Sequence, residues 1–559
     1  MDPRTERPEA GPGTRFDRRR LLSLGAGAAA IAAWGATGCA SAPSPTPVRA
    51  TTGVGWNGGP VAHLIPTANH DRILLKASFT EALQSPPQLR VDGRPVEGTM
   101  TDPQGRFWRF DARGLRPGTV HELRLVDRGG APLTDPWPLK TFPAPDAAAE
   151  RVRIVAYTCA GGYDGVVIRG KTGFLDMGAR HRLLARALSF EPDALIANGD
   201  HIYWDQETAL NKPFARIAKE EVWPKFGGAL DLSVPMLHPR NAAIYLKVCD
   251  DQIPRLYGTR LRSTPSFFIV DDHDYFENDE FDDKVATLPP DSYGPAAADQ
   301  TQRLYYPEFL PDANRPLWLP GGDKAWLPEA THGQFGTIRY GTLLEAVLYD
   351  CRRFVDYKGV HARIVPQWTE DWLVARTRAE DTAHFFHAPS LPFAYSSGKL
   401  GDWYPDLLDE RTGKLVMSDT KPGWQTGWFA QHQRLVGAMA SQKKRAAVIV
   451  QGDFHATAAG RMLRSDRLKL DRPVHAVLAG TLGTGDLGFP SAYRGVESRP
   501  SLLLEMEQAL APTEKNGFTV IDVTTDAMTF SIYTWRPPQP VEDIATMKPA
   551  LVYAVPRSA

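Results

Sequence analysis

The segment 194–205 constrains the fold of this chain more than any other. An apolar run, Ala194-Leu-Ile-Ala197, passes at once into Asn-Gly-Asp-His-Ile-Tyr-Trp-Asp at 198–205. A short apolar run that ends in such a cluster predicts a buried strand, which delivers Asp200 and Tyr203 to one edge of a sheet. Carboxylate and phenolate oxygens suit a hard, highly charged metal ion. The pattern recurs at 446–455, where an apolar strand ends in Gly-Asp-Phe-His. Together the two segments predict a metal centre at the carboxyl edge of a central sheet.

The surrounding sequence alternates between strand and helix patterns. Strands are expected at 152–157, 194–198, 265–270, 446–451, 474–478 and 518–522, a hairpin at 337–349, and helices at 177–190 and 427–441. This alternation predicts an α/β fold for residues 147–559, an α+β sandwich of two mixed sheets flanked by helices. Residues 49–146 carry short alternating segments separated by turns, which predict an N-terminal all-β sandwich of immunoglobulin or fibronectin type.

Two stretches, 278–335 and 379–425, are long, rich in proline, glycine and aromatic residues, and weakly periodic. Long irregular insertions in compact domains are usually functional lids or binding loops. We therefore expect these two stretches to be functional lids or binding loops.

Residues 1–48 read as a targeting segment and tether. Asp17-Arg-Arg-Arg-Leu-Leu-Ser23 resembles a twin-arginine export signal, and Ala36-Thr-Gly-Cys39 resembles a lipobox in which Cys39 is acylated. We expect recognition by the twin-arginine export machinery and a location in the periplasm, the cell envelope or the medium, with Cys39 as the lipid anchor. The alternative is a disordered basic tail that carries a chance cysteine.

Charge and cysteine content narrow the classes of function. A formal net charge of -1 gives no support for nucleic-acid binding. Beyond Cys39, the chain has only Cys159, Cys249 and Cys351. Three cysteines do not make a disulfide framework, so at least one is expected to be a thiol with another purpose.

Four strand ends carry the chemistry. In chain order they are Cys159-Ala-Gly-Gly162, Gly199-Asp-His-Ile-Tyr203, Asp271-Asp-His-Asp274 and Gly452-Asp-Phe-His455. This order is similar to that of calcineurin-like metallophosphoesterases. The cysteine, the tyrosine and a later Asp350-Cys-Arg352 resemble the PhoD-type alkaline phosphatases and phosphodiesterases. The resemblance runs from about residue 54 to the C-terminus. Each motif alone is weak, because a cysteine after a strand usually packs in a core and a Gly-Asp pair usually makes a turn.

The resemblance implies a two-metal site that holds Fe(III) and Ca(II). It implies that Fe(III) is bound by Cys159, Asp200, Tyr203 and His455. Asp200 would bridge to Ca(II), whose shell Asp453 completes together with either Asp272 or Asn278, of which Asn278 is favoured.

The resemblance also implies a phosphoric ester hydrolase in which a metal-bound hydroxide attacks phosphorus. His273 would protonate the leaving group, and Arg352 would neutralise charge on the phosphoryl oxygens, although Arg353 competes for that role. The substrate would be a phosphate-ester small molecule or polymer.

Two other classes of function remain open. One is a non-catalytic envelope protein that keeps the fold and binds glycan or polymer, which the intact ligand set opposes. The other is a mononuclear redox iron protein, which would not use the additional carboxylates.

Overall fold

The computed structural model describes residues 55–164, 167–168, 170–206, 218–278, 293–311 and 335–558. The export signal and Cys39 lie outside the described residues, as do 279–292 and 312–334 of the first expected lid. Within the described ranges, no helix is both long and apolar enough to cross a membrane.

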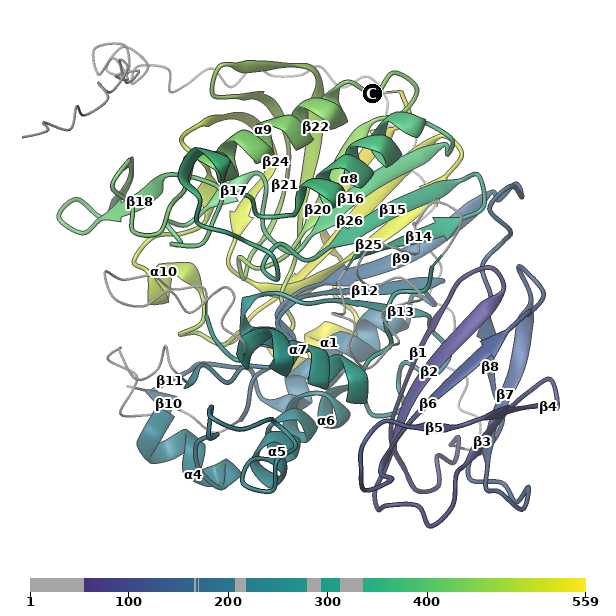
Figure 1. Cartoon of the computed structure of the whole chain (residues 1–559). Helices are drawn as coiled ribbons and strands as arrows, with labels where there is room; N and C mark the ends of the chain where they lie inside the picture. Colours follow the sequence, from purple (N-terminus) through teal and green to yellow (C-terminus); the bar gives the residue numbers. More distant parts are fainter. Residues whose placement is uncertain are drawn as a thin grey trace, which may run out of the picture. The chain divides into compact units, whose positions relative to one another are not determined.

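The N-terminal part is a sandwich of two four-stranded sheets (Figure 1). One sheet has the order β1-β2-β6-β5 and the other β4-β3-β7-β8. Side chains from both sheets share one core, which includes Leu75, Phe110 and Leu123. In β7 buried residues alternate with exposed or half-buried ones, as expected for a strand with one face on a core. The strands are β1 (Val61–Ala68), β2 (Arg72–Phe79), β3 (Gln88–Val91), β4 (Arg94–Glu97), β5 (Thr99–Met100), β6 (Phe107–Arg113), β7 (Val120–Val126) and β8 (Trp137–Lys140).

The remainder is built on two large mixed sheets. The first is six-stranded, in the order β13-β12-β9-β25-β26-β27, and the second is seven-stranded, in the order β14-β15-β16-β20-β22-β21-β24. The first contains β9 (Arg151–Tyr157), β12 (Ala194–Asn198), β13 (Ser266–Ile269), β25 (Asn516–Thr524), β26 (Ala527–Trp535) and β27 (Pro549–Pro556). The second contains β14 (Phe335–Tyr340), β15 (Leu344–Tyr349), β16 (His384–Pro389), β20 (Ala447–Gln451), β21 (Thr457–Ser465), β22 (Leu468–Ala479) and β24 (Leu504–Thr513).

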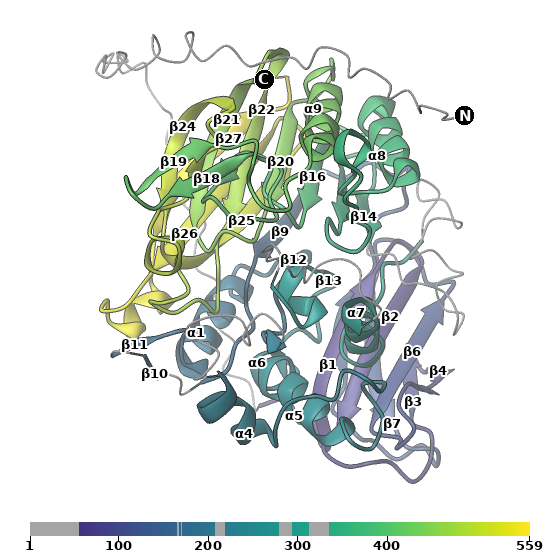
Figure 2. The same ribbon diagram turned by 60° about the vertical axis from the view of Figure 1, so that its left-hand side comes forward.

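The two sheets pack face to face, and helices cover their outer faces (Figures 1 and 2). Apolar side chains of both sheets, such as Ile154 and Val448, form the central core. The first sheet is covered by α1 (Met177–Leu188), α5 (Ala242–Gln252), α6 (Pro254–Tyr257) and α7 (Tyr293–Leu304), and the second by α8 (Gln367–Ala379) and α9 (Thr426–Ala440). The predicted fold class, two mixed sheets flanked by helices behind a β-sandwich, is confirmed.

Short elements complete the described chain. They are β10 (Val167–Ile168), β11 (Lys171–Thr172), η2 (Ala218–Val222), α4 (Trp223–Phe226), η3 (Asp272–Tyr275), η5 (Gly359–His361), β17 (Tyr395–Ser396), β18 (Asp406–Asp409), β19 (Lys414–Met417), α10 (Pro490–Tyr493), β23 (Arg499–Pro500) and η6 (Val541–Ala545).

Buried polar contacts join the β-sandwich to the α/β region. Lys76 Nζ donates to Glu308 Oε1 at 2.9 Å, and His63 Nε2 lies 2.8 Å from the carbonyl oxygen of Tyr305. Both lysine and histidine are fully buried. Residues 50–559 form one compact unit. The predicted domain boundary at 146 falls between β8 and β9.

The prediction that 379–425 is a lid is wrong for its first part. Strand β16 is buried throughout and lies between β15 and β20, inside the second sheet. Its sequence, His-Phe-Phe-His-Ala-Pro, does not read as an apolar run because two histidines and a proline interrupt it. The buried ring of His387 has partners on both sides, Tyr349 Oη at 3.2 Å and Thr377 Oγ1 at 2.9 Å, which explains why a central strand tolerates it.

Candidate metal centre

The polar residues that follow β9, β12 and β20 all turn back toward one another through an unusual backbone conformation. Cys159, Asp200, Asp453 and His455 have φ values of +48°, +61°, +71° and +45°. Left-handed backbone is uncommon for residues other than glycine and costs of order 1–3 kcal/mol per residue. Such residues persist only where their surroundings hold them and are concentrated at functional sites. Their presence at three strand ends marks this edge of the sheets as a candidate site.

The loops after β12 and β13 approach each other closely at Gly199. Its φ is +82°, and a Cβ at this position would lie 2.5 Å from the Cβ of Asp271. Its backbone N–H donates to the carbonyl oxygen of Ile269 at 2.8 Å. Glycine is therefore required for the two carboxylate-bearing loops to meet.

Asp274 holds the same two loops together by its carboxylate. Oδ1 accepts the backbone N–H of His201 at 2.7 Å and of Ile202 at 3.1 Å. Oδ2 accepts the N–H of Asp200 at 2.8 Å and of Asp271 at 3.0 Å. Four backbone donors on one buried carboxylate fix the position from which Asp200 projects.

The first group of ligand atoms centres on Asp200. Its Oδ2 lies 3.1 Å from Cys159 Sγ and 3.0 Å from Tyr203 Oη. Tyr203 Oη is 3.1 Å from His455 Nε2, and the ligand atoms of Cys159, Asp200 and His455 all lie within 4.8 Å of one another. His455 Nδ1 lies 2.5 Å from the carbonyl oxygen of Gly488, so that nitrogen carries the proton and Nε2 presents its lone pair to the group.

Electrostatics show that this group suits a cation. Burial, followed by neighbouring carboxylates, raises the pKa values of Cys159, Tyr203 and Asp200 well above their ordinary values. Burial lowers the pKa of His455 to about 4, so its imidazole is neutral at pH 7. Asp200 Oδ1 is buried and has no hydrogen-bond partner among the described residues. A thiol, a phenol and a carboxyl group that keep their protons here would release them to a strongly charged metal ion, and the donor set fits one.

A second group consists of Asp200, Asp271, Asp272 and Asp453, whose oxygen atoms also lie within 4.8 Å of one another. Two cationic side chains already contact this group. Lys399 Nζ donates to Asp272 Oδ2 and to Asp453 Oδ1, both at 2.7 Å. Arg352 Nε donates to Asp271 Oδ1 at 2.8 Å, and its Nη2 lies 3.4 Å from Asp453 Oδ2. All six side chains are nearly inaccessible to solvent.

His273 lies beside both groups. A ring nitrogen lies within 4.8 Å of oxygens of Asp200 and Asp272. Nδ1 is 2.7 Å from Asp205 Oδ1, and the ring lies over that of Tyr203 with centroids 4.1 Å apart. Burial opposes a charge on His273, but Asp205, Asp200 and Asp272 outweigh it and raise its pKa well above the ordinary value. The imidazole is therefore poised to carry a proton at the edge of the centre.

The structure brings most of the predicted residues together. Seven of them lie within hydrogen-bond or metal-ligand distance of one another at this edge: Cys159, Asp200, Tyr203, Asp272, His273, Asp453 and His455. Arg352 reaches the carboxylates, whereas Arg353 turns away to Asp299 at 2.8 Å. Asn278 is buried at the end of the segment that follows η3. Its role as a ligand, and the choice between it and Asp272, stay predictions.

Sequence reasoning missed three residues that shape the centre, namely Lys399, Asp205 and Gln252. Gln252, at the end of α5, accepts the backbone N–H of Gly162 at 2.6 Å and of Tyr203 at 2.7 Å. It thus fixes the loop that carries Tyr203. A glutamine on a helix gives no sequence signal of such a role, and Lys399 lies in a stretch without periodicity. Of the three, only Asp205 could have been suggested by its position, five residues after Asp200 of the Gly-Asp motif.

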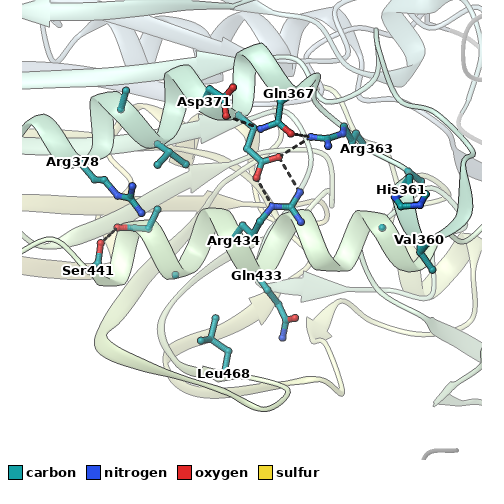
Figure 3. Close-up of a pocket in the computed structure, with 17 residues that line it drawn as sticks. Val360, His361, Arg363, Gln367, Asp371, Arg378, Gln433, Arg434, Ser441 and Leu468 are labelled. Carbon is teal, nitrogen blue, oxygen red and sulfur yellow. Dashed lines mark hydrogen bonds and ion pairs between the residues drawn. The ribbon is translucent and has the colours of Figure 1, made fainter. Parts of the chain in front are cut away.

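A cavity of about 900 Å³ lies elsewhere, between α8 and α9 (Figure 3). Glu370 connects the two helices there, since its carboxylate accepts Arg434 Nε at 2.5 Å and Gln431 Nε2 at 2.9 Å. The residues that line this cavity include none of those in the metal centre. We assign it to the packing of the two helices.

Comparison with solved structures relates this arrangement to known folds. The chain is similar to the structure of PhoD with a TM-score of 0.57 and 15% identity, over 89% of this chain and 90% of that one. It also matches a purple acid phosphatase, PPD1 from yellow lupin seeds (Lupinus luteus), with a TM-score of 0.49 and 13% identity, over 90% of this chain and 75% of that one. No family model and no curated protein matches the chain. The likeness to PhoD confirms that the chain has the PhoD-type fold that the sequence motifs predicted.

Proposed function

We propose that this protein is an exported, metal-dependent phosphoric ester hydrolase of the alkaline phosphatase and phosphodiesterase type. One observation carries the proposal. On a PhoD-like fold, Cys159, Asp200, Tyr203 and His455 converge at one sheet edge, with a four-carboxylate group that shares Asp200. Fold alone does not define an activity, but donors of these types at this edge suit metal-assisted ester hydrolysis.

The first ligand group favours Fe(III). A thiolate and a phenolate stabilise a trivalent ion better than a divalent alkaline-earth ion, which prefers carboxylate and neutral oxygens. Cys159, Asp200, Tyr203 and His455 would hold it. When bound, the ion supplies Lewis-acid stabilisation of charge on the phosphoryl group.

His273 would act as the proton donor to the leaving group. The Asp205 carboxylate holds Nδ1 and raises the pKa of the ring, so the proton to be transferred is on Nε2. The Tyr203 ring packs against the imidazole at an interplanar angle of 34° and restricts its rotation. Arg352, which donates to the carboxylate of Asp271, would add positive charge near the phosphoryl oxygens.

The position of Lys399 opposes binding of the Ca(II) ion that the sequence resemblance implies. Asp453, one of its proposed ligands, and Asp272, the alternative to Asn278 for another, already bind the ammonium group of Lys399. The second group therefore does not fit Ca(II) in this arrangement, and no step is assigned to that ion.

Export is part of the proposal and rests on the N-terminal sequence. The Arg-Arg-Arg stretch at 18–20 would direct the folded protein to the twin-arginine machinery, and Cys39 would anchor it to a membrane through lipid. Labelling with a radioactive fatty acid checks the anchor: the wild-type protein should incorporate it and Cys39→Ser should not.

Metal analysis of the purified protein, combined with hydrolysis of a chromogenic phosphomonoester and phosphodiester, tests the proposed activity. We expect bound iron, hydrolysis of at least one ester, and loss of both in Asp200→Ala. Cys159→Ser should weaken iron binding and remove absorption from thiolate-to-iron charge transfer. Metal-free, inert wild-type protein would overturn the proposal. Iron-loaded protein that hydrolyses no ester would favour the non-catalytic polymer-binding alternative.

A further inference from the structure

Lys399 occupies the position of a cation within the second carboxylate group. Its ammonium nitrogen is 2.7 Å from an oxygen of Asp272 and 2.7 Å from an oxygen of Asp453. The lysine is 4% exposed, and the two carboxylates are 0% and 7% exposed. Solvent does not weaken the ion pairs of a buried lysine with two carboxylates at these distances, whereas it screens an ion pair at the surface.

The backbone around Lys399 is built to deliver it there. Strand β17 pairs with β23, with Tyr395 opposite Pro500, immediately before the lysine. Gly398 then turns with a φ of +70°, where a Cβ would lie 3.0 Å from the backbone nitrogen of Leu408. Beyond the lysine, the carbonyl oxygen of Gly401 accepts Arg352 Nη1 at 3.0 Å.

A second buried ion pair fixes the far side of this loop. Asp402 Oδ1 accepts Lys421 Nζ at 2.6 Å, and Asp402 Oδ2 accepts Ser396 Oγ at 3.1 Å. The loop is thus attached on both sides of Lys399, and its side chain enters the centre from a rigid support.

An ammonium group and a metal ion cannot share this position. Ca(II) binds carboxylate oxygens at about 2.3–2.6 Å, close to the 2.7 Å of the ammonium contacts, so both cations would lie at nearly the same point. Two positive charges so close repel strongly in a buried site. Ca(II) would enter this group only if Lys399 left it.

We propose that Lys399 supplies the second positive charge of the centre, in place of a second metal ion. The protein then binds one metal ion, at the Cys159–Tyr203–His455 side of Asp200, and needs no calcium. This inference deepens the proposed function and rests on it only for the catalytic consequence, because the number and position of bound metal ions are measured without a substrate.

Calcium binding to the iron-loaded protein tests the proposal, with Lys399→Met as the variant and Lys76→Met as the matched control. Both substitutions remove a buried lysine that pairs with a carboxylate, but Lys76 pairs with Glu308, whereas Lys399 contacts Asp272 and Asp453. We expect the wild-type protein and Lys76→Met to show one metal ion per chain by elemental analysis and no heat of calcium binding by calorimetry. Lys399→Met should bind one additional calcium ion and gain thermal stability when calcium is added, because a ligand that binds only the folded state raises the melting temperature.

Either of two outcomes overturns the proposal. Wild-type protein that binds one calcium ion per chain would show that Lys399 does not exclude the second metal. Lys399→Met that binds no more calcium than Lys76→Met would show that Lys399 does not occupy a metal position. Should Lys399→Met fail to fold, the calcium titration of the wild-type protein still decides. Absence of esterase activity in all three proteins would overturn the proposed function and leave the metal count as a separate result.

Discussion

Replacement of Asp274 by asparagine isolates the part of the centre that positions Asp200. In the wild-type protein two carboxylate oxygens accept four backbone N–H groups, from Asp200, His201, Ile202 and Asp271. An asparagine keeps one oxygen and sets its NH₂ group against two of those donors. Hydrogen bonds to a charged acceptor contribute about 1.5–3 kcal/mol each, so loss of two should cost about 3–6 kcal/mol of folding free energy.

The same substitution should also weaken metal binding, because outer-shell partners of a ligand usually change metal affinity about 10–100-fold. The assay is the rate at which a strong chelator removes the metal, followed by absorbance, together with unfolding in urea. Asp102→Asn is a matched control. Asp102 lies in the β-sandwich and accepts the backbone N–H of Gly105, Arg106 and Phe107 at 3.2, 3.1 and 2.9 Å.

We expect both variants to unfold at lower urea concentrations and only Asp274→Asn to lose its metal faster. An Asp274→Asn protein that retains metal as long as Asp102→Asn does would refute this reasoning. The hydrogen bonds of the Asp274 carboxylate would then have no part in the placement of Asp200.

Two further predictions concern pH. In Asp205→Asn the pKa of His273 should fall, because Asp205 is the foremost of the carboxylates that raise it. If His273 must be protonated to act, the loss of kcat at alkaline pH should begin at lower pH than in the wild type, while Asp299→Asn, which removes the partner of Arg353, should leave the profile in place. Asp111 in β6 pairs with Arg72 at 2.7 Å; burial disfavours its charge, but Arg72 and Arg113 outweigh burial and lower its pKa from 3.8 to about 2. Its ionised form therefore stabilises the fold at pH values above the unfolded pKa near 3.8, by about 1–2 kcal/mol after allowance for partial exposure. This contribution should disappear as pH falls through 3.8 toward 2. Asp111→Asn should therefore lower the melting temperature at pH 7 but not at pH 2. An equal decrease of the melting temperature at both pH values would contradict this assignment.

Much of the fold could be predicted because its central strands are short apolar runs with clear ends. The strands at 152–157 and 194–198 appear as β9 and β12, and the predicted hairpin at 337–349 appears as antiparallel β14 and β15. The site could be approached in the same way, since parallel strands deliver the residues that follow them to one edge. The residues that directly follow such strands can therefore be assigned to the same edge of the sheet from the sequence alone.

What could not be predicted depends on contacts between distant segments. Lys399 reaches Asp272 across 127 residues and Asp453 across 54, and nothing near it in the sequence distinguishes it from a surface lysine. Gln252 reaches Tyr203 from a helix 49 residues away. Strand β16 was hidden because its buried histidine has partners from β15 and α8, and pattern reading treats a histidine as polar without knowledge of those partners.

The strained backbone and the buried charges of the centre have a common explanation. Cys159, Asp200, Asp453 and His455 adopt left-handed conformations that cost free energy, and four buried carboxylates lie within a few ångströms of one another. Lys399 and Arg352 offset the charge on the side of Asp272, Asp271 and Asp453. On the side of Cys159 and Tyr203, burial and the neighbouring Asp200 raise the pKa values of the thiol and the phenol and so favour their protonated forms. A metal ion that replaces those protons would stabilise the strained loops directly, so the same interaction that equips the centre for chemistry would also hold its strand ends in place.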